Sequence, residues 1–185
     1  MKRVAVILAN GFEEIEALSV VDILRRADID ALCVGLDRAL VVGAHGVSVK
    51  VDLLLSELRE IELDAIVLPG GLPGAQNLAD SKELGEILRR FDDNGKLICA
   101  ICAAPMALAK AGVLKGAFTC YPGFETNVRS DKNGYISDKN VICDHNIITS
   151  RGPATAMEFA LEIVKELNGT SSYESVRDGL LYHSL

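Results

Sequence analysis

Four short apolar runs constrain the fold of this sequence more than any other feature. They are nearly continuous and rich in Val, Ile and Leu. Strands that are buried on both faces of a parallel sheet have this composition, whereas half-buried strands alternate apolar and polar residues. The sequence therefore predicts that these runs form strands of a mostly parallel sheet. The runs are Val4–Leu8, Ala31–Val34, Ala65–Leu68 and Leu97–Ile101.

Helical patterns lie between and after these runs, over Ile15–Leu24, Leu84–Phe91 and Met157–Leu167. Strands that alternate with helices are typical of a doubly wound α/β sandwich, because right-handed crossovers place helices on both faces of the sheet. Gly43–Val51 interrupts this order and predicts a hairpin. Asp144–Asn146 predicts a tight turn between two further strands.

Length and charge exclude several classes of protein. The 185 residues suit one domain of ~100–200 residues, and without a linker or repeat we expect a single domain over residues 1–185. A net charge of −7 with no basic block argues against nucleic-acid binding. No stretch approaches the ~18 apolar residues of a membrane span. Val4–Ala9 is too short for a signal peptide, which needs an apolar core of ~7–15 residues, so we expect a cytoplasmic protein.

The five cysteines are an odd number, which suits free thiols in a reducing compartment. Cys99 and Cys102 form a Cys-x-x-Cys motif. If Cys99 lies within a strand, the two residues are ~10 Å apart and point to opposite faces. A disulfide needs Cα atoms within ~7 Å. We therefore expect Cys99 to belong to the core.

Cys102 directly follows the apolar run Leu97–Ile101, at the position where the strand turns into a helix. Sites in doubly wound sheets form at the carboxyl ends of strands. Small neighbours leave room for a sharp turn like the nucleophile elbow of hydrolases, and a helix N-terminus favours a thiolate. From spacing alone two alternatives stay open, a reactive nucleophile and a buried, inert cysteine.

Two other strand ends carry candidate groups. Glu16 lies at the start of the first helix, on the same face as Glu13; such acidic residues often only complement the helix dipole. Beside a thiolate, however, a carboxyl group should have a raised pKa. Protonated Glu16 could then donate a hydrogen bond to the sulfur and act as general acid and base. The Gly70-Gly71 turn could supply oxyanion-binding N–H groups, or it could be an ordinary tight loop.

None of the three histidines, His45, His145 and His183, adjoins Cys102 in the sequence. No ligand spacing typical of a metal site occurs, and no Gly-rich motif indicates a nucleotide. We therefore expect a cysteine–carboxylate site without a metal and without a cofactor.

Five short motifs follow one another along the chain. They are Gly11-Phe12-Glu13-Glu14-Ile15-Glu16, Leu68-Pro69-Gly70-Gly71, Gly74-Ala75-Gln76-Asn77-Leu78, Ala100-Ile101-Cys102-Ala103-Ala104-Pro105 and Thr149-Ser150-Arg151-Gly152-Pro153. No single motif is specific, but the ordered set strongly resembles the ThiJ/PfpI superfamily, in its DJ-one branch. The similarity spans essentially the whole chain.

The resemblance implies a flavodoxin-like sandwich, usually a homodimer, with a nucleophile-elbow cysteine at Cys102 and its carboxyl partner at Glu16. It implies backbone oxyanion donors at Gly71 and Ala103, and ready oxidation of Cys102 to sulfinic acid. Activities associated with this branch are glutathione-independent glyoxalase, protein deglycation and redox-responsive chaperoning. Older descriptions add thiazole monophosphate biosynthesis and proteolysis.

The sequence departs from related patterns at two positions. Protease-like members carry His directly after the elbow cysteine, where this chain has Ala103, so we do not expect peptidase activity. The DJ-one branch places a His near the site, where this chain has Tyr121, which could contact the substrate instead. Class I glutamine amidotransferases need Gly-x-Cys-x-Gly and a later His/Glu pair, and this chain lacks both.

We therefore expect a cysteine-dependent glyoxalase or deglycase in defence against oxidative and carbonyl stress. Its partners would be methylglyoxal-type dicarbonyls or their early adducts on proteins and thiols. One alternative is a redox sensor or chaperone in which Cys102 is oxidised. Another is a binding domain with an inert Cys102, which a thiol pKa near ~8.5 would favour.

Overall fold

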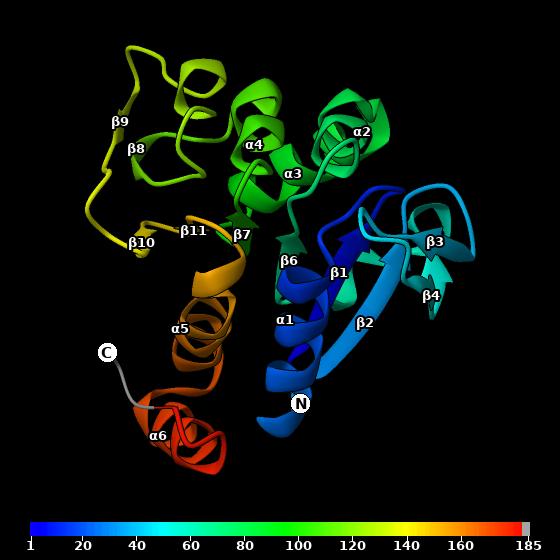
Figure 1. The fold of residues 1–185 in the computed structure, drawn as a ribbon, viewed down its shortest axis with the longest axis vertical. Helices are drawn as coiled ribbons and strands as arrows, with labels where there is room; N and C mark the ends of the chain where they lie inside the picture. The colour runs from blue at the N-terminus through cyan, green and yellow to red at the C-terminus, as the bar shows by residue number, and fades with distance from the viewer. Residues whose placement is uncertain (183–185) are drawn as a thin grey trace.

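The computed structural model describes residues 1–182. Its central feature is a seven-stranded sheet with helices on both faces (Figure 1). The strands are β1 (Arg3–Leu8), β2 (Asp30–Gly35), β5 (Leu53–Leu54), β6 (Ala65–Leu68), β7 (Leu97–Ile101), β10 (Val141–Asp144) and β11 (Ile147–Ser150). They lie in the order β10-β11-β7-β6-β1-β2-β5. Only β10 runs antiparallel to its neighbour.

The helices form two layers over this sheet. They are α1 (Glu14–Arg26), α2 (Gly74–Asp80), α3 (Lys82–Asp93), α4 (Pro105–Ala111), α5 (Ala156–Asn168) and α6 (Thr170–Gly179). Short 3-10 turns occur at Leu55–Glu57, Glu60–Glu62, Glu125–Asn127 and Pro153–Thr155. The predicted doubly wound, mostly parallel α/β fold is confirmed.

Two small two-stranded sheets lie outside the central sheet: β3 (Leu40–Val42) with β4 (Ser48–Lys50), and β8 (Gly116–Phe118) with β9 (Asn133–Tyr135). The β3–β4 pair is antiparallel, as the predicted hairpin requires. The turn predicted at Asp144–Asn146 joins β10 to β11, which are antiparallel. The periodicity does not reveal α2 or α4, because each is seven residues long and spans only about two helical turns.

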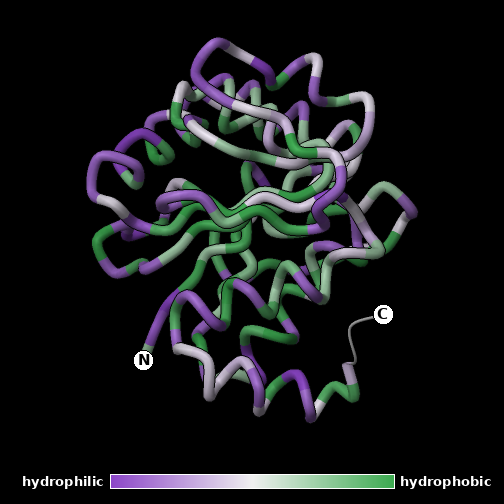
Figure 2. The backbone as a smooth tube through the Cα atoms, turned by 90° about the vertical axis from the view of Figure 1, so that its left-hand side faces the viewer, coloured by the Kyte–Doolittle hydropathy of each residue, from purple (hydrophilic) through white to green (hydrophobic). Residues whose placement is uncertain are grey.

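The core lies in two parts because side chains alternate across the sheet. Along β1, Val4, Val6 and Leu8 join the cluster formed with α1 and α5. Ala5 and Ile7 join the cluster formed with α3 and α4. Figure 2 shows the resulting pattern, with hydrophobic strands through the middle of the molecule and hydrophilic segments at its periphery. Burial on both faces explains why the strands are continuous apolar runs.

The buried face of α1 differs from the one that the spacing predicts. Ile15 and Leu18 are 56% and 39% exposed, whereas Val20, Ile23 and Leu24 are buried. A strict three-residue spacing falls about 60° short of a full turn at each step. Four residues so spaced therefore extend over half the helix circumference, and only part of that set can face the sheet.

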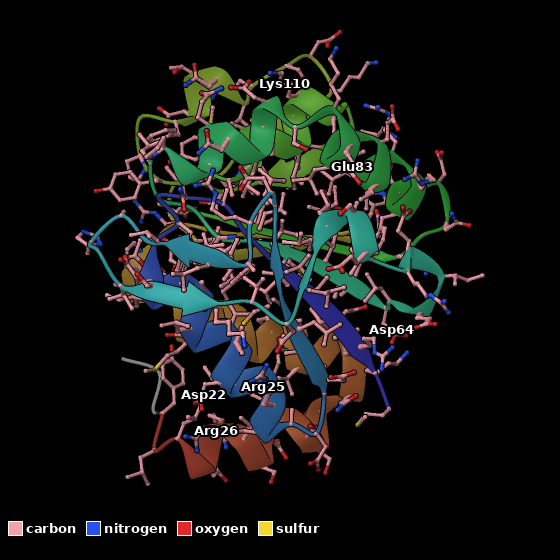
Figure 3. All side chains as sticks on the ribbon, turned by 90° about the vertical axis from the view of Figure 1, so that its right-hand side faces the viewer. Asp22, Arg25, Arg26, Asp64, Glu83 and Lys110 are labelled. Carbon is pink, nitrogen blue, oxygen red and sulfur yellow. The ribbon has the colours of Figure 1, made fainter. Side chains whose placement is uncertain are left out.

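Charged side chains occupy the outer surfaces of both helical layers. Figure 3 shows Asp22, Arg25 and Arg26 on α1 at one side of the molecule, and Glu83 and Lys110 on α3 and α4 at the other. Arg26 forms an i,i+4 ion pair with Asp22 at 2.7 Å. No helix within residues 1–182 combines the length and apolar character needed to cross a membrane.

Candidate active site

Cys102 lies in a sharp turn between β7 and α4. Its φ of +64° is in the left-handed region, which is uncommon for a residue other than glycine. Backbone hydrogen bonds hold it there: its N–H donates to the Ser150 carbonyl, and its carbonyl accepts from the Tyr121 N–H, both at 3.0 Å. A strained residue fixed by its surroundings is a common feature of functional sites. The turn has the form that the elbow hypothesis requires.

Glu16 lies in the first turn of α1 and is fully buried. Its Oε2 accepts a 2.7 Å hydrogen bond from the Gly70 N–H, and its Oε1 has no hydrogen-bond partner within residues 1–182. Glu13 precedes the helix and caps it, because its Oε2 accepts from the Glu16 N–H at 2.9 Å. The structure thus places a buried carboxyl group at the carboxyl edge of the sheet, beside Cys102.

Gly70 separates the two reactive groups and leaves no space for a side chain. A Cβ atom there would lie 2.6 Å from Cys102 Cβ and 2.8 Å from Glu16 Oε2. Gly71 has a φ of +84°, and a Cβ on it would lie 2.4 Å from the Glu13 nitrogen. Glycine is therefore required at both positions. The Gly70 N–H, which donates a hydrogen bond to Glu16, was not among the predicted site groups.

The protonation of Glu16 and Cys102 is linked. Burial raises the pKa of Glu16 to about 7, and the charge of Glu13 acts in the same direction. Burial also raises the pKa of the Cys102 thiol, to about 12, and an ionised Glu16 contributes to that rise; the N–H groups of Gly71 and Ala103 oppose both effects. Because two adjacent negative charges are unfavourable, the pair loses one proton near pH 7 and keeps the other to much higher pH. These values leave the second proton mainly on sulfur, and the thiolate belongs to the minor form in which Glu16 holds the proton instead.

The predicted site residues come from separate segments. Cys102, Glu16, Gly71 and Ala103 lie together at the strand ends. Tyr121 reaches them through its backbone bond to Cys102, and it is 46% exposed. With its neighbours it lines a surface cavity of about 410 Å³. The other lining residues are Pro122, Asn140, Arg151 and Gly152–Thr155.

The remaining cysteines differ from Cys102 in position. Cys99 is fully buried within β7, as expected, and all five cysteines are free thiols. Cys143 is the exposed one. The Cys99-x-x-Cys102 motif therefore forms no disulfide in this structure.

His45 is the residue near the site that the sequence does not indicate. His45 and Glu14 are 31 positions apart in the sequence, and the β3–β4 hairpin brings them together. His45 Nδ1 lies 2.9 Å from Glu14 Oε2 and 3.8 Å from Glu13 Oε1. His145 lies on a different hairpin, beside Asp144. His183 falls outside the described residues.

Comparison with known proteins supports the resemblance. The model of the DJ-1/PfpI family matches residues 2–166. Protein dj-1beta of Drosophila melanogaster is 42% identical over 182 residues, covering 97% of each chain. Its crystal structure superimposes with a TM-score of 0.95 at 41% identity over 99% of each chain.

Two further relatives bear on function and redox state. A Caenorhabditis elegans protein named glutathione-independent glyoxalase DJR-1.2 is 35% identical over 164 residues, 89% of this chain and 87% of that protein. A structure of oxidized DJ-1 from Toxoplasma gondii has a TM-score of 0.91 at 37% identity over the whole of both chains. The family match over most of the sequence, together with these relatives, shows that the chain belongs to the DJ-1/PfpI family.

Proposed function

We propose that this protein is a glutathione-independent glyoxalase that acts on methylglyoxal-type dicarbonyls, or a deglycase that acts on their early adducts with proteins. The observation that carries the proposal is the buried pair of Cys102 and Glu16 on either side of Gly70. The similarity to a glyoxalase-named relative at 35% identity supports the same reaction class. A thiol and a carboxyl group this close together suit a reaction that needs both a nucleophile and a group that carries a proton.

In the first step, the Cys102 thiolate attacks the aldehyde carbon of methylglyoxal. A carbon–sulfur bond forms, and the carbonyl π electrons move to oxygen to give a hemithioacetal. The N–H groups of Gly71 and Ala103, which favour negative charge at the sulfur, would also hold the developing oxyanion. Protonated Glu16 would supply the proton that the oxyanion takes up, which leaves Glu16 as a carboxylate.

In the second step, Glu16 would carry a proton between adjacent carbons. Its carboxylate removes the proton from the carbon bonded to sulfur, and the electron pair of that bond moves to the ketone oxygen to give an enediolate. The hydroxyl proton on the first carbon passes to this oxygen, and Glu16 returns its proton to the neighbouring carbon, which leaves a carbonyl group on the carbon bonded to sulfur. The product is a thioester of lactate with Cys102. Water then cleaves the thioester to lactate and regenerates the thiol. A carboxyl group with a pKa of about 7 suits both halves of this transfer near neutral pH.

The test is lactate formation from methylglyoxal by purified protein in the absence of glutathione. Cys102→Ala should abolish turnover, because it removes the proposed nucleophile. Cys143→Ala is the matched control and should retain activity, because Cys143 is an exposed thiol on β10. Lactate production by wild type no greater than by Cys102→Ala would overturn the proposal.

A second candidate function is peroxide sensing through oxidation of Cys102 to sulfinic acid. The N–H groups of Gly71 and Ala103 and a protonated Glu16 could stabilise the oxygens of that product. Low peroxide should then add two oxygens to Cys102 alone, as peptide mass spectrometry would show. Glu16→Ala should change the product. Equal oxidation of Cys143 would count against a dedicated sensor.

A further inference from the structure

Two glutamates and a histidine from separate segments meet at the start of α1. Glu13 directly precedes the helix, Glu14 is its first residue, and His45 lies in the β3–β4 hairpin. One potential metal-ligand atom from each lies within 4.8 Å of the other two, and within residues 1–182 no other three His, Cys, Asp or Glu side chains gather so closely. Ligand spacing along the sequence does not reveal this group, because 31 positions separate His45 from Glu14.

Each carboxylate has one oxygen fixed by main-chain donors and the other directed to the imidazole. Glu14 Oε1 accepts from the His45 N–H at 2.7 Å and from the Val47 N–H at 3.3 Å, while its Oε2 lies 2.9 Å from His45 Nδ1. Glu13 Oε2 accepts from the Glu16 N–H at 2.9 Å, while its Oε1 lies 3.8 Å from His45 Nδ1. Hydrogen bonds that orient the ligand side chains in this way are typical of metal sites.

The hairpin is packed directly on the Glu14 carboxyl group. Gly43 has no side chain, and a Cβ atom there would overlap that carboxyl group. The Ala44 N–H donates to the Phe12 carbonyl at 2.8 Å and so ties the hairpin to the residue before Glu13. The backbone therefore holds the three side chains together without help from a bound ion.

Glu13 Oε1 lacks a hydrogen-bond partner although the side chain of Glu13 is only 9% exposed. Within the described residues the carboxylate of Glu13 accepts a hydrogen bond through Oε2 alone, and 3.8 Å is too long for a hydrogen bond from His45 Nδ1. His45 is also the one basic side chain of residues 1–182 that pairs with Glu13 or Glu14. Burying two carboxylates beside at most one positive charge is costly, and a divalent cation would offset that cost.

The chemistry and spacing of these ligand atoms suit zinc. Zinc binds imidazole nitrogen and carboxylate oxygen at ~2.0–2.2 Å, which places tetrahedral ligand atoms about 3.3 Å apart. The separations of 2.9 Å and 3.8 Å from His45 Nδ1 lie on either side of this value. The His45 side chain is 72% exposed and is therefore free to make the small adjustment. An imidazole ligand favours zinc over magnesium or calcium, which prefer oxygen ligands.

We propose that Glu13, Glu14 and His45 form a zinc site, with Glu13 Oε1, Glu14 Oε2 and His45 Nδ1 as ligands and water in the fourth position. Three protein ligands and one open position are typical of zinc sites that solvent can reach. The inference goes beyond the proposed function, because none of these side chains attacks the dicarbonyl or carries its proton. The hydrogen bond of Glu13 Oε2 to the Glu16 N–H stays in place when Oε1 binds the ion.

The test is metal binding by protein treated with EDTA, at pH ~8, where an ordinary imidazole is neutral. Isothermal titration calorimetry should show one zinc ion per chain, and Co²⁺ should give the visible absorption of an ion with nitrogen and oxygen ligands. His45→Asn should weaken zinc binding at least tenfold, since changes outside the ligand set alone cost about 10–100-fold. Glu13→Gln and Glu14→Gln should weaken it similarly, because the amide oxygen keeps the main-chain hydrogen bond but has no charge. Circular dichroism checks that each variant is folded.

The matched control is His145→Asn. His145 Nδ1 lies 2.7 Å from Asp144 Oδ1, but within residues 1–182 this pair has no third ligand nearby. The control should bind zinc as wild type does. If His45→Asn binds zinc as tightly as His145→Asn, the inference is wrong and His45 forms an ion pair only.

Thiols also bind zinc, so Cys102→Ala is needed to separate the two sites. This variant should still bind one zinc ion, and bound Co²⁺ should show no thiolate charge-transfer band. A band that disappears in Cys102→Ala together with the bound ion would place the metal on sulfur and overturn the inference. Lactate formation by the EDTA-treated protein tests the proposed function separately, so either idea can fail while the other stands.

Discussion

At the scale of single residues, Glu16 couples chemistry to stability. Its pKa rises from 4.5 to about 7 in the folded protein, first because it is buried. Between these values the folded state binds a proton that the unfolded chain has lost. The contribution of Glu16 to the free energy of unfolding is therefore fully present below pH ~4.5. It is lost as the pH rises through about 7, and the loss amounts to about 3 kcal/mol in total.

Glu16→Gln removes the ionisable group and should remove this decline. The variant should be more stable than wild type at pH ~8, by up to about 3 kcal/mol, and similar to it at pH ~4.5. Urea unfolding followed by circular dichroism at both pH values measures the difference. Glu86→Gln, at an exposed position on α3, is the control. A constant difference between the Glu16 variant and wild type across pH would contradict the expectation.

At the scale of elements, the turn between β6 and α2 determines whether the site can form. Gly70→Ala should destabilise the protein by about 1–3 kcal/mol, the usual range for an overpacked core, because the new methyl group would meet Cys102 and Glu16. It should also slow alkylation of Cys102 and abolish turnover. Both are measured on the same preparation, after circular dichroism shows that the fold is retained.

Gly85→Ala gives a matched comparison, because Gly85 lies inside α3 and a Cβ there would meet only Arg89, at 3.7 Å. This variant should be more stable by about 1 kcal/mol, since alanine is the better helix former, and its Cys102 should react as in wild type. Unimpaired alkylation in Gly70→Ala would show that the close contact is readily relieved.

At the scale of the whole molecule, exposed apolar side chains on α1 and the β3–β4 hairpin are where we expect self-association. Ile15 and Leu18 on α1 are 56% and 39% exposed, and Val47 on the hairpin is 48% exposed. The Val47 N–H bond to Glu14 brings the hairpin beside α1. Grouped apolar residues on a surface are typical of protein interfaces. The homodimer that the resemblance implies remains a prediction, and this face is where we expect it to form.

Leu18→Lys should weaken such a dimer at least tenfold, because it would bury an unpaired charge at the interface. Sedimentation equilibrium over a range of protein concentrations measures the change. Ile61→Lys is the control, since Ile61 is 89% exposed and lies in another element, the 3-10 turn Glu60–Glu62. A monomeric wild type, or equal effects of the two substitutions, would rule out this interface.

The sequence by itself determined the sheet and the position of the candidate site within it. Continuous apolar runs encode strands that are buried on both faces, so β6 and β7 have the residue ranges that were predicted. Parallel strands end at one edge, which is why Cys102, Glu16 and Gly71 could be grouped before their contacts were known. These features depend on local composition and on a few general rules of topology.

Only the tertiary structure decided how that site is surrounded and charged. His45 reaches Glu14 because the β3–β4 hairpin folds back onto the start of α1, a contact 31 positions apart that no local periodicity records. Glu16 has a raised pKa because packing excludes water from it, and Ile15 is exposed because the sheet covers another face of α1. Solvent access and long-range contacts arise from the whole fold. The residues alone could therefore name the reactive groups and predict a raised pKa for Glu16 beside a thiolate, but only the structure shows that burial is the main cause of that rise.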